Sequence, residues 1–543
     1  MIEIIRNSLI CRGFVRMGHA LYGWWLNSLI CRVIMGLKNA WRHSACYRVW
    51  LRFGQADPAV NVSRYARFMA WLRGICERIG GVIAHSLFYR VLLAIKRGWL
   101  RLCAHSRILR LINSLSLHQW VLVAFGMYLP MEFIIRDTLA VPVLSSIWEE
   151  LFILIAAALV IWRRAMKQTS ALKRETPMDA WLILFIAVGF FLMSVVRPYP
   201  AVAFAGYRIV VEYMLWFFLI VRLIEDDRDM KVFLAGICAM ASFLALHGIY
   251  QFAIGVDIPT SWVSHSEMGV RTRVFSLTGS PNILGSLMVL TAPIMAGLVY
   301  YLKKTWQKLI AFGLLGCFLL TLLFTFSRGA WVGLVVAVII FAWLVDKRLL
   351  AVGGTAIAGV LVAVPSITSR LTYLFTADYA ELSALGGRAQ RWQAGWDLLH
   401  ENSPWFGFGM GRFGGAVAMN NKLLDETETF RYFYMDNYYL KTLVEMGYIG
   451  MIAYIILLVA LLIIGIKAVQ RSDRELAAIP GDPLVRGIGN MRVMAAGIFA
   501  GLCGVLTHCY FENIFEEPYM TAYFWGLAAL LIYLGFFRKK EKQ

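Results

Sequence analysis

The sequence predicts an all-α polytopic membrane protein preceded by a basic N-terminal region. Of its 543 residues, 60% are hydrophobic and only 16% are charged, whereas soluble domains carry about 25% charged residues. The mean hydropathy is +0.65. Several apolar runs reach the roughly 20 residues that a helix needs to cross a bilayer. These observations exclude a soluble enzyme and also a disordered or fibrous protein.

The N-terminal region, residues 1–115, carries most of the positive charge. It holds 18 Lys and Arg against 3 Asp and Glu, a net charge of +15 out of +20 for the whole chain. A Ser-x-x-x-Arg motif recurs about every 20 residues, from Asn7–Arg12 to His105–Arg110, with apolar residues and tryptophans between the copies. We expect short amphipathic helices on an anionic membrane surface. Nucleic-acid binding is not expected, because no DNA- or RNA-binding motif is present.

The body of the chain is expected to cross the membrane about twelve times. The predicted spans lie near residues 117–135, 146–162, 179–196, 202–224, 232–254, 277–302, 308–326, 329–345, 349–366, 440–468, 491–511 and 518–537. The resulting domains are the surface region 1–115, nine spans in 116–366, a long outer loop at 367–439, and three spans with a basic tail in 440–543. A loop of that length is usually functional.

Basic residues in the short loops set the expected orientation. With a cytoplasmic N-terminus, the clusters at Arg163–Arg164, Lys303–Lys304, Lys347–Arg348 and Arg538–Lys540 all lie inside. We therefore expect a multi-pass protein of the plasma (inner) membrane with both termini in the cytoplasm. The loop 367–439 then lies outside, where ATP and nucleotide sugars are absent. Chemistry in this loop would need a lipid-borne donor or a gradient.

Arg328 stands between two apolar spans, in the segment TLLFTFSRGAWVG. A charge at membrane depth is unfavourable by about 2.5–3.5 kcal/mol on insertion scales, so such residues often mark function. The alternative is an interfacial arginine whose side chain reaches the lipid headgroups. Position alone leaves both interpretations open.

The long loop contains the segment GGRAQRWQAGWDLLHENSPWFGFGMGRFGG, residues 386–415. A helix is expected from about Arg388 to Leu399, followed by a turn at Asn402–Pro404. Arg388 and Arg391 would share one face of that helix, and guanidinium groups suit bidentate binding of phosphate. The glycines at 407, 409 and 411 permit a tight backbone close to a ligand or a membrane. They are not a dinucleotide fingerprint, because no strand precedes them.

Asp436 and Asn437 stand where this loop re-enters the membrane. Either residue could simply cap the helix that begins there, or it could take part in chemistry. Arg273 adds an outer cation ahead of a helix that is expected to begin at Pro281. Acidic residues around the first outer turn, among them Asp137, form a further candidate set.

Taken together, these segments resemble the O-antigen ligase and O-antigen polymerase-related family of membrane glycosyltransferases. The resemblance covers roughly residues 117–537 and rests on the SRGAW turn, the stretch from GGR to PWFGFGMGRF, and the DNYYLKTLVEMGYIG re-entry. It implies a glycosyltransferase-C-like fold. It also implies transfer of a glycan from undecaprenyl pyrophosphate to an acceptor hydroxyl on a glycan, lipid or protein, outside the plasma membrane.

The resemblance also implies roles for individual residues. Arg328 and Arg388 would hold the donor's pyrophosphate, and Asp436 matches the position of the family's proposed base, where ligases carry His before Asn. The neighbouring Arg391, Arg273 and Asn437 are predicted to help bind substrate. Preplaced guanidinium groups would stabilise the charge that develops on the leaving phosphates, so no metal or other cofactor is expected.

Three other functions are alternatives. A polyprenyl-phosphate-sugar glycosyltransferase would use an acidic residue of the first outer loop, such as Asp137. A secondary transporter would show two related halves with broken helices near the midplane, and no such repeat is visible in the sequence. A membrane scaffold would depend on the basic repeats of residues 1–115.

Overall fold

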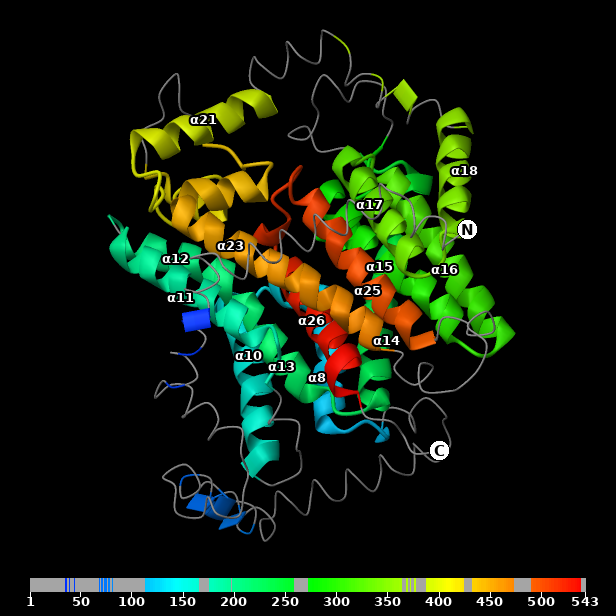
Figure 1. Cartoon of the computed structure of the whole chain (residues 1–543), viewed down its shortest axis with the longest axis horizontal. Coiled ribbons are helices and arrows are strands. Elements are labelled where there is room, and N and C mark those ends of the chain that lie inside the picture. Colours follow the sequence, from blue (N-terminus) through cyan, green and yellow to red (C-terminus); the bar gives the residue numbers. More distant parts are fainter. Residues whose placement is uncertain are drawn as a thin grey trace. The chain divides into compact units, whose positions relative to one another are not determined.

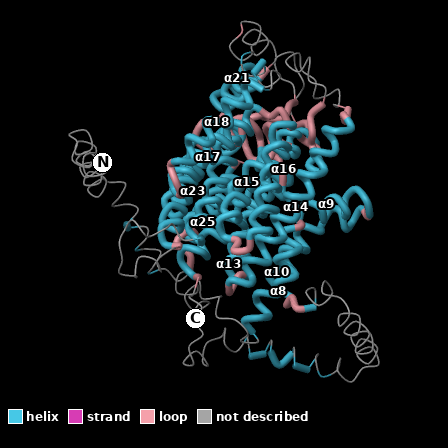
Figure 2. The backbone as a smooth tube through the Cα atoms, turned by 90° about the vertical axis from the view of Figure 1, so that its right-hand side faces the viewer, coloured by secondary structure: helices cyan, strands magenta, loops and turns pink. Residues whose placement is uncertain are grey.

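The computed structural model shows a bundle of helices (Figures 1 and 2). It describes residues 113–165, 175–257, 272–363, 387–423, 432–472 and 490–538, apart from residue 197, with isolated residues between 35 and 81 and between 368 and 376. The chain divides into two compact units, Met1–Leu92 and Leu93–Gln543, and all elements below belong to the second. The surface helices predicted for residues 1–115 lie almost entirely outside the described residues.

A helix occupies each of the twelve predicted spans. The first six spans correspond to α8 (Leu117–Gly126) with α9 (Tyr128–Phe133), α10 (Pro142–Ala165), α11 (Asp179–Val195), α12 (Pro200–Val211) with α13 (Leu215–Leu223), α14 (Asp227–Ile254) and α15 (Pro281–Tyr301). The other six correspond to α16 (Thr305–Phe324), α17 (Arg328–Leu344), α18 (Arg348–Ala363), α23 (Tyr438–Arg471), α25 (Asn490–His508) and α26 (Pro518–Ile532).

Not all of these helices are long enough to cross a bilayer by themselves. Among the described residues, 8 helices are long and apolar enough, or 9 if the bent pair α8 and α9 counts as one span. The helices α11 and α17 are apolar but shorter. An all-helical polytopic architecture is therefore confirmed in the described part of the chain, while twelve spans and a single long loop stay predictions.

The centre of the bundle is formed by α15, α25 and α26 (Figure 1). In their most apolar windows, 78% of the residues of α15 and 83% of those of α25 and α26 are buried, against 22% in α16. A helix that is apolar all round is buried in protein or lipid. The exposed side chains of α16, such as Leu309 and Phe312, accordingly suit contact with lipid.

Small residues let α15 and α25 pack with their backbones almost in contact. A Cβ on Gly501 would lie 2.2 Å from the carbonyl oxygen of Leu290, so no larger residue fits there. Close approach through small residues is typical of membrane helices. The pairing also holds the two helix ends together, where Ser286 Oγ lies 2.7 Å from His508 Nδ1.

The first predicted span is not a straight helix, because α8 and α9 meet at an angle of 80°. Pro130 has no N–H to donate to the carbonyl of Gly126, so a regular helix cannot continue there. The hydroxyl of Tyr523 on α26 donates to Gly126 O (3.0 Å) and accepts from Leu129 N (3.1 Å). A distant tyrosine thus satisfies the backbone groups that the bend exposes.

The bundle has two chemically different ends. The N-termini of α15, α17, α23 and α26 meet at one end, which we call the α21 end after the loop helix α21 (Arg388–Glu401) that lies there (Figure 2). A second loop helix, α22 (Ala416–Asn421), follows. The opposite end carries the basic residues at or after the C-termini of these helices, namely Lys303–Lys304, Lys347–Arg348, Arg471 and Arg538.

Candidate active site

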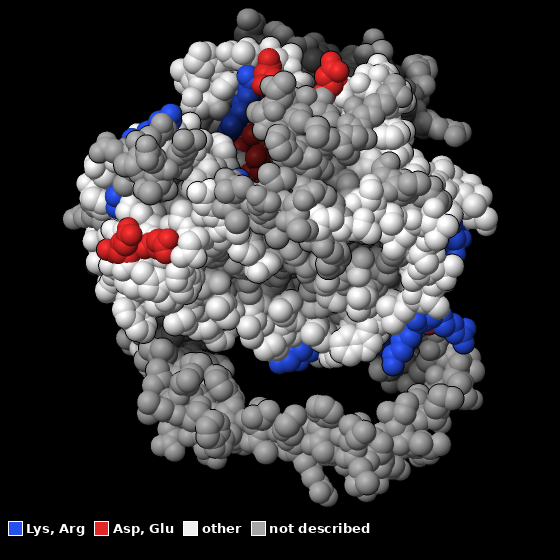
Figure 3. Space-filling view, turned by 90° about the horizontal axis from the view of Figure 1, so that it is seen from above, with Lys and Arg blue, Asp and Glu red and all other residues white. Residues whose placement is uncertain are grey.

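The helix α21 places three donors around one carboxylate. Arg388 Nε and Arg391 Nη2 donate to Asp436 Oδ2 at 2.6 and 2.9 Å, and Trp392 Nε1 donates to Asp436 Oδ1 at 3.1 Å. Residues three and four apart share a helix face, so the predicted common face of Arg388 and Arg391 is confirmed. Seen from the α21 end, basic and acidic side chains lie together in a recess of the surface (Figure 3).

The long helix α23 is interrupted at Gly447, where φ is +63° and ψ is −171°. Backbone groups that lose their helical partners must be satisfied elsewhere. The loop after α21 supplies the new partners through four backbone hydrogen bonds: Phe408 N to Val444 O (2.8 Å), Gly409 N to Glu445 O (3.1 Å), Tyr448 N to Pro404 O (2.8 Å) and Ile449 N to Trp405 O (3.2 Å). The loop is therefore hydrogen-bonded to α23 on both sides of the interruption.

Two of the loop glycines lie directly against neighbouring helices. A Cβ on Gly407 would lie 2.5 Å from Glu445 O in α23, and one on Gly411 would lie 2.6 Å from Val202 O in α12. Both glycines have positive φ, which other residues rarely adopt. Their role in the described structure is to let the loop pack against two helices, and this packing fixes the position of α21.

A buried ion-pair cluster holds the loop on the other side. Lys441 Nζ lies 3.0 Å from Glu445 Oε2 and 3.3 Å from Glu516 Oε2. The two carboxylates also accept backbone N–H groups of the loop, from Phe413 (3.2 Å) and Ala416 (2.6 Å). Removing one partner of such a buried cluster costs about 3–5 kcal/mol, so the loop has a defined position.

The turn between α25 and α26, residues 509–517, borders Asp436 and its arginines. Arg388 Nη2 donates to the carbonyl of Phe511 at 3.0 Å. The backbone N–H of Tyr438, at the start of α23, donates to Cys509 O at 2.9 Å. Three segments far apart in the sequence, namely α21, the start of α23 and this turn, therefore converge at one place.

A second chain of polar contacts reaches the same turn from α15. Arg273 is buried; its Nε donates to Thr325 O (3.0 Å) and its Nη2 to Asn282 Oδ1 (3.3 Å). The amide nitrogen of Asn282 in turn donates to a carboxylate oxygen of Glu512. Arg273 therefore approaches the turn through Asn282.

Arg328 is the first residue of α17 and is partly buried. A Cβ on the adjacent Gly329 would lie 2.7 Å from Phe511 Cβ and 2.8 Å from the ring of His508. The start of α17 thus packs directly on the turn that also accepts the hydrogen bond from Arg388. The structure brings Arg328 and Arg388 to the same turn.

Asp436 and Asn437 have different environments, although they are neighbours in the sequence. Asn437 is buried and is the N-cap of α23, because its side chain accepts a hydrogen bond from Leu440 N at 3.0 Å. The capping alternative therefore holds for Asn437. Asp436 is not the cap; its carboxylate instead binds the two arginines and the tryptophan of α21.

The acidic residues of the first outer turn lie around other arginines. Arg136 lies 3.4 Å from Glu132 and 3.3 Å from Glu149, and Arg208 pairs with Glu150 and Glu212. Asp137 is exposed. The glutamates of the first outer turn therefore form ion pairs with Arg136 and Arg208, and Asp436 is not a member of these pairs.

Glu512, Asn282 and Trp392 were not assigned roles from the sequence. Asn282 and Glu512 are 230 residues apart, so no local pattern could have joined them. Burial raises the pKa of Glu512 above its usual value, Arg388 opposes this, and Asp436 raises the pKa further. Glu512 is therefore a carboxylate with a stronger affinity for a proton than an ordinary glutamate.

The fold and the site together define a polytopic helical membrane protein with a polar, arginine-rich site at one end of the bundle. In the described residues no group of three or more His, Cys, Asp and Glu could hold a metal ion. Residues 313–455 match the family model described as O-antigen ligase. A comparison with curated proteins finds no match.

The family match confirms the resemblance to an O-antigen ligase-related family over this part of the chain. It supports a role in glycan transfer during O-antigen or polysaccharide assembly. The matched segment runs from α16 into α23 and includes Arg328, Arg388 and Asp436. Glu512 and Asn282 lie outside it.

Proposed function

We propose that the protein transfers a glycan from a polyprenyl-pyrophosphate donor to an acceptor hydroxyl at the α21 end of the bundle. The observation that carries the proposal is that Arg388 and the start of α17, which carries Arg328, both meet the turn 509–517, while Arg391 lies beside Arg388 on Asp436. Guanidinium groups bind phosphate oxygens with good geometry. Placed in advance, they stabilise the charge that grows on the pyrophosphate as its bond to the sugar breaks.

The charge distribution supports an outer location for this site. The opposite end of the bundle carries Lys303–Lys304, Lys347–Arg348 and Arg538. Basic residues next to membrane spans favour the cytoplasmic side, and this supports an outer position for the α21 end. A donor available there is carried by a lipid, in agreement with the proposed undecaprenyl-pyrophosphate substrate.

Asp436 is proposed to position the arginines, rather than to act as the base that the family resemblance implied. A carboxylate offers about four lone-pair sites, and Asp436 already accepts three hydrogen bonds from α21. Its negative charge holds Arg388 and Arg391 side by side. Without the Asp436 carboxylate between them, the two guanidinium groups would repel each other.

Glu512 is proposed as the general base. In the transfer, the bond between the anomeric carbon and the pyrophosphate oxygen breaks, and the bonding electrons leave with the pyrophosphate. The acceptor oxygen forms the new bond to the anomeric carbon, and its proton passes to the Glu512 carboxylate. The raised pKa of Glu512 brings its basicity closer to what proton transfer near neutral pH requires.

Separate substitution of Arg328 and Arg388 by Ala tests the proposed function. Purified full-length protein in proteoliposomes would be given a lipid-linked glycan and an acceptor, and donor consumption would be measured. Each variant should lose at least about 100-fold in rate, as expected when a charge-stabilising donor is removed.

The control is Asp137→Ala, because Asp137 is exposed and outside the proposed machinery. This variant should keep wild-type activity. Full activity in either arginine variant would contradict the proposal. Loss of activity in Asp137→Ala alone would instead favour the polyprenyl-phosphate-sugar transferase.

A further inference from the structure

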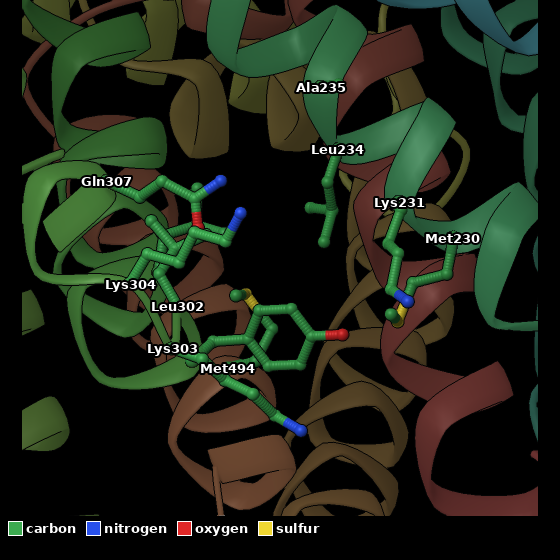
Figure 4. Close-up of a pocket in the computed structure, with 11 residues that line it drawn as sticks. Met230, Lys231, Leu234, Ala235, Leu302, Lys303, Lys304, Gln307 and Met494 are labelled. Atoms are coloured by element: carbon green, nitrogen blue, oxygen red, sulfur yellow. The ribbon is translucent and has the colours of Figure 1, made fainter. Parts of the chain in front are cut away.

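A cavity of about 620 Å³ lies at the end of the bundle opposite the candidate site. Its walls come from the start of α14, the junction between α15 and α16, and the start of α25. Figure 4 shows Met230 and Lys231 on one side, Lys303, Lys304 and Gln307 on the other, and Met494 between them. Its volume falls within the roughly 300–1,000 Å³ that ligand sites usually occupy.

The cavity has an apolar wall and a basic rim. Met230, Leu234 and Met494 are buried and form part of the apolar wall, which Leu298 extends. Lys231, Lys303 and Lys304 are exposed at the mouth. Such a division suits a molecule with an apolar chain and an anionic group, and it does not suit a fully polar solute.

The acidic residues beside the cavity are already engaged by other partners. Asp227 binds Arg538 through two hydrogen bonds of 2.8 Å, and Asp229 binds His118 and Gln119. By contrast, within the described part of the chain the ammonium groups of the three rim lysines form no ion pair with an acidic side chain. The rim therefore presents three positive charges to a ligand.

The position of the cavity along the bundle matches the headgroup region of a bilayer. The helix α15 has 21 residues and is about 30 Å long at 1.5 Å per residue, close to the thickness of the hydrocarbon core. Its N-terminus carries Asn282 at the candidate site, and its C-terminus lines the cavity through Leu298 and Tyr301. The cavity and the site thus lie at opposite membrane surfaces.

We propose that this cavity binds one anionic glycerophospholipid. Its phosphate would lie among Lys231, Lys303 and Lys304, and one acyl chain would follow the apolar wall. Basic pockets between membrane helices on the cytoplasmic side favour anionic headgroups. The bound lipid would join α14, α15, α16 and α25 and so stabilise the bundle. This inference does not depend on the proposed glycan transfer.

Binding can be measured on the full-length protein by native mass spectrometry and by thermal unfolding in detergent. Phosphatidylglycerol, phosphatidylethanolamine and inorganic phosphate are the three probes. The wild type should retain one phosphatidylglycerol per chain and melt at a higher temperature when this lipid is added, because a ligand of the folded state stabilises it. Phosphatidylethanolamine and inorganic phosphate should have much weaker effects.

Two variants test the two parts of the cavity. The triple variant K231Q/K303Q/K304Q removes the charge and should weaken phosphatidylglycerol binding at least about tenfold. Ala235→Phe adds a large side chain to the apolar wall, narrows the cavity and should also weaken phosphatidylglycerol binding. It tests the proposal independently of the triple variant, including the case in which the loss of three charges prevents that variant from folding. Lys308→Gln is the matched control, since Lys308 is an exposed lysine of α16 outside the cavity, and its binding should equal that of the wild type.

Three results would overturn the proposal. Equal retention of phosphatidylglycerol and phosphatidylethanolamine by the wild type would show no preference for an anion. Unchanged binding in both the triple variant and Ala235→Phe would place the lipid elsewhere. Competition by inorganic phosphate at concentrations similar to those of the lipid would identify a site for a soluble anion instead.

Discussion

At the scale of single residues, the site depends on one carboxylate shared by two arginines. Asp436 lies 2.6 Å from Arg388 and 2.9 Å from Arg391. The shared ion pair lets two like charges stand next to each other before any substrate arrives. An arrangement prepared in this way needs little reorganisation when a diphosphate binds. The same ion pair makes Asp436 a poor choice for a base and directs attention to Glu512.

Glu512→Gln should reduce kcat by about 100-fold or more, because loss of a general base typically costs 10²–10⁴ in rate. The KM for the lipid-linked donor should change little, since the arginines remain. The raised pKa of Glu512 also sets the sign of the pH effect. A carboxylate accepts a proton only when ionised, so wild-type activity should rise with pH through a pKa above the usual 4.3 or so. The measurement is kcat/KM against pH for both proteins.

Asp137→Ala serves as the control for Glu512→Gln, because it removes a carboxylate from the same end of the bundle without touching the site. Its pH profile should match that of the wild type. If Glu512→Gln kept full activity, and its kcat/KM fell at low pH as in the wild type, Glu512 would not be the base.

At the scale of elements, the interruption of α23 at Gly447 positions the loop. The residues 404–409 take up the backbone groups that this interruption frees, and α21 precedes them directly. The helix α21 and the common face of its arginines could be predicted, because both follow from local spacing. The position of α21 could not, because it depends on backbone contacts with α23, about 40 residues further along the chain.

Gly447→Ala tests the role of the interruption. A Cβ at this position would lie 2.4 Å from both Gly407 N and Trp405 O, and the positive φ adds strain of about 1–3 kcal/mol. We expect a lower melting temperature and a loss of glycan transfer as the loop is displaced. Melting temperature and donor consumption would be measured on the same preparation.

The matched control for Gly447→Ala is Gly316→Ala on α16. A Cβ there meets nothing within 4 Å, and replacing glycine in a helix with alanine stabilises by up to about 1 kcal/mol. This variant should be as stable as the wild type or more stable. Equal stability and activity of Gly447→Ala and Gly316→Ala would show that the loop does not depend on the interruption.

At the scale of the whole molecule, composition was sufficient to predict a helical membrane protein. Apolar runs identify helices reliably, because a membrane helix must satisfy its own backbone hydrogen bonds. The 80° bend between α8 and α9 was missed, since it needs both Pro130 and the hydroxyl of Tyr523. The contact between Asn282 and Glu512 was missed for a similar reason, because it depends on the packing of α15 against α25.

The central helices also connect the two ends of the molecule. The helix α15 carries Asn282 at the candidate site and Leu298 at the opposite cavity, and α25 carries His508 and Met494 in the same way. The same buried pair of helices therefore contributes to the candidate site and to the cavity at the other end of the bundle. A lipid at one surface and a lipid-linked donor at the other would both bind to this shared framework.

The central claim is that the arginines at the α21 end hold a diphosphate. The most direct test is a density map of the full-length protein with a polyprenyl pyrophosphate bound. The diphosphate should contact Arg388, Arg391 and Arg328 beside the turn 509–517, with Glu512 facing the sugar. A diphosphate bound among Glu132, Arg136 and Glu149, or one that touches neither Arg328 nor Arg388, would contradict the claim.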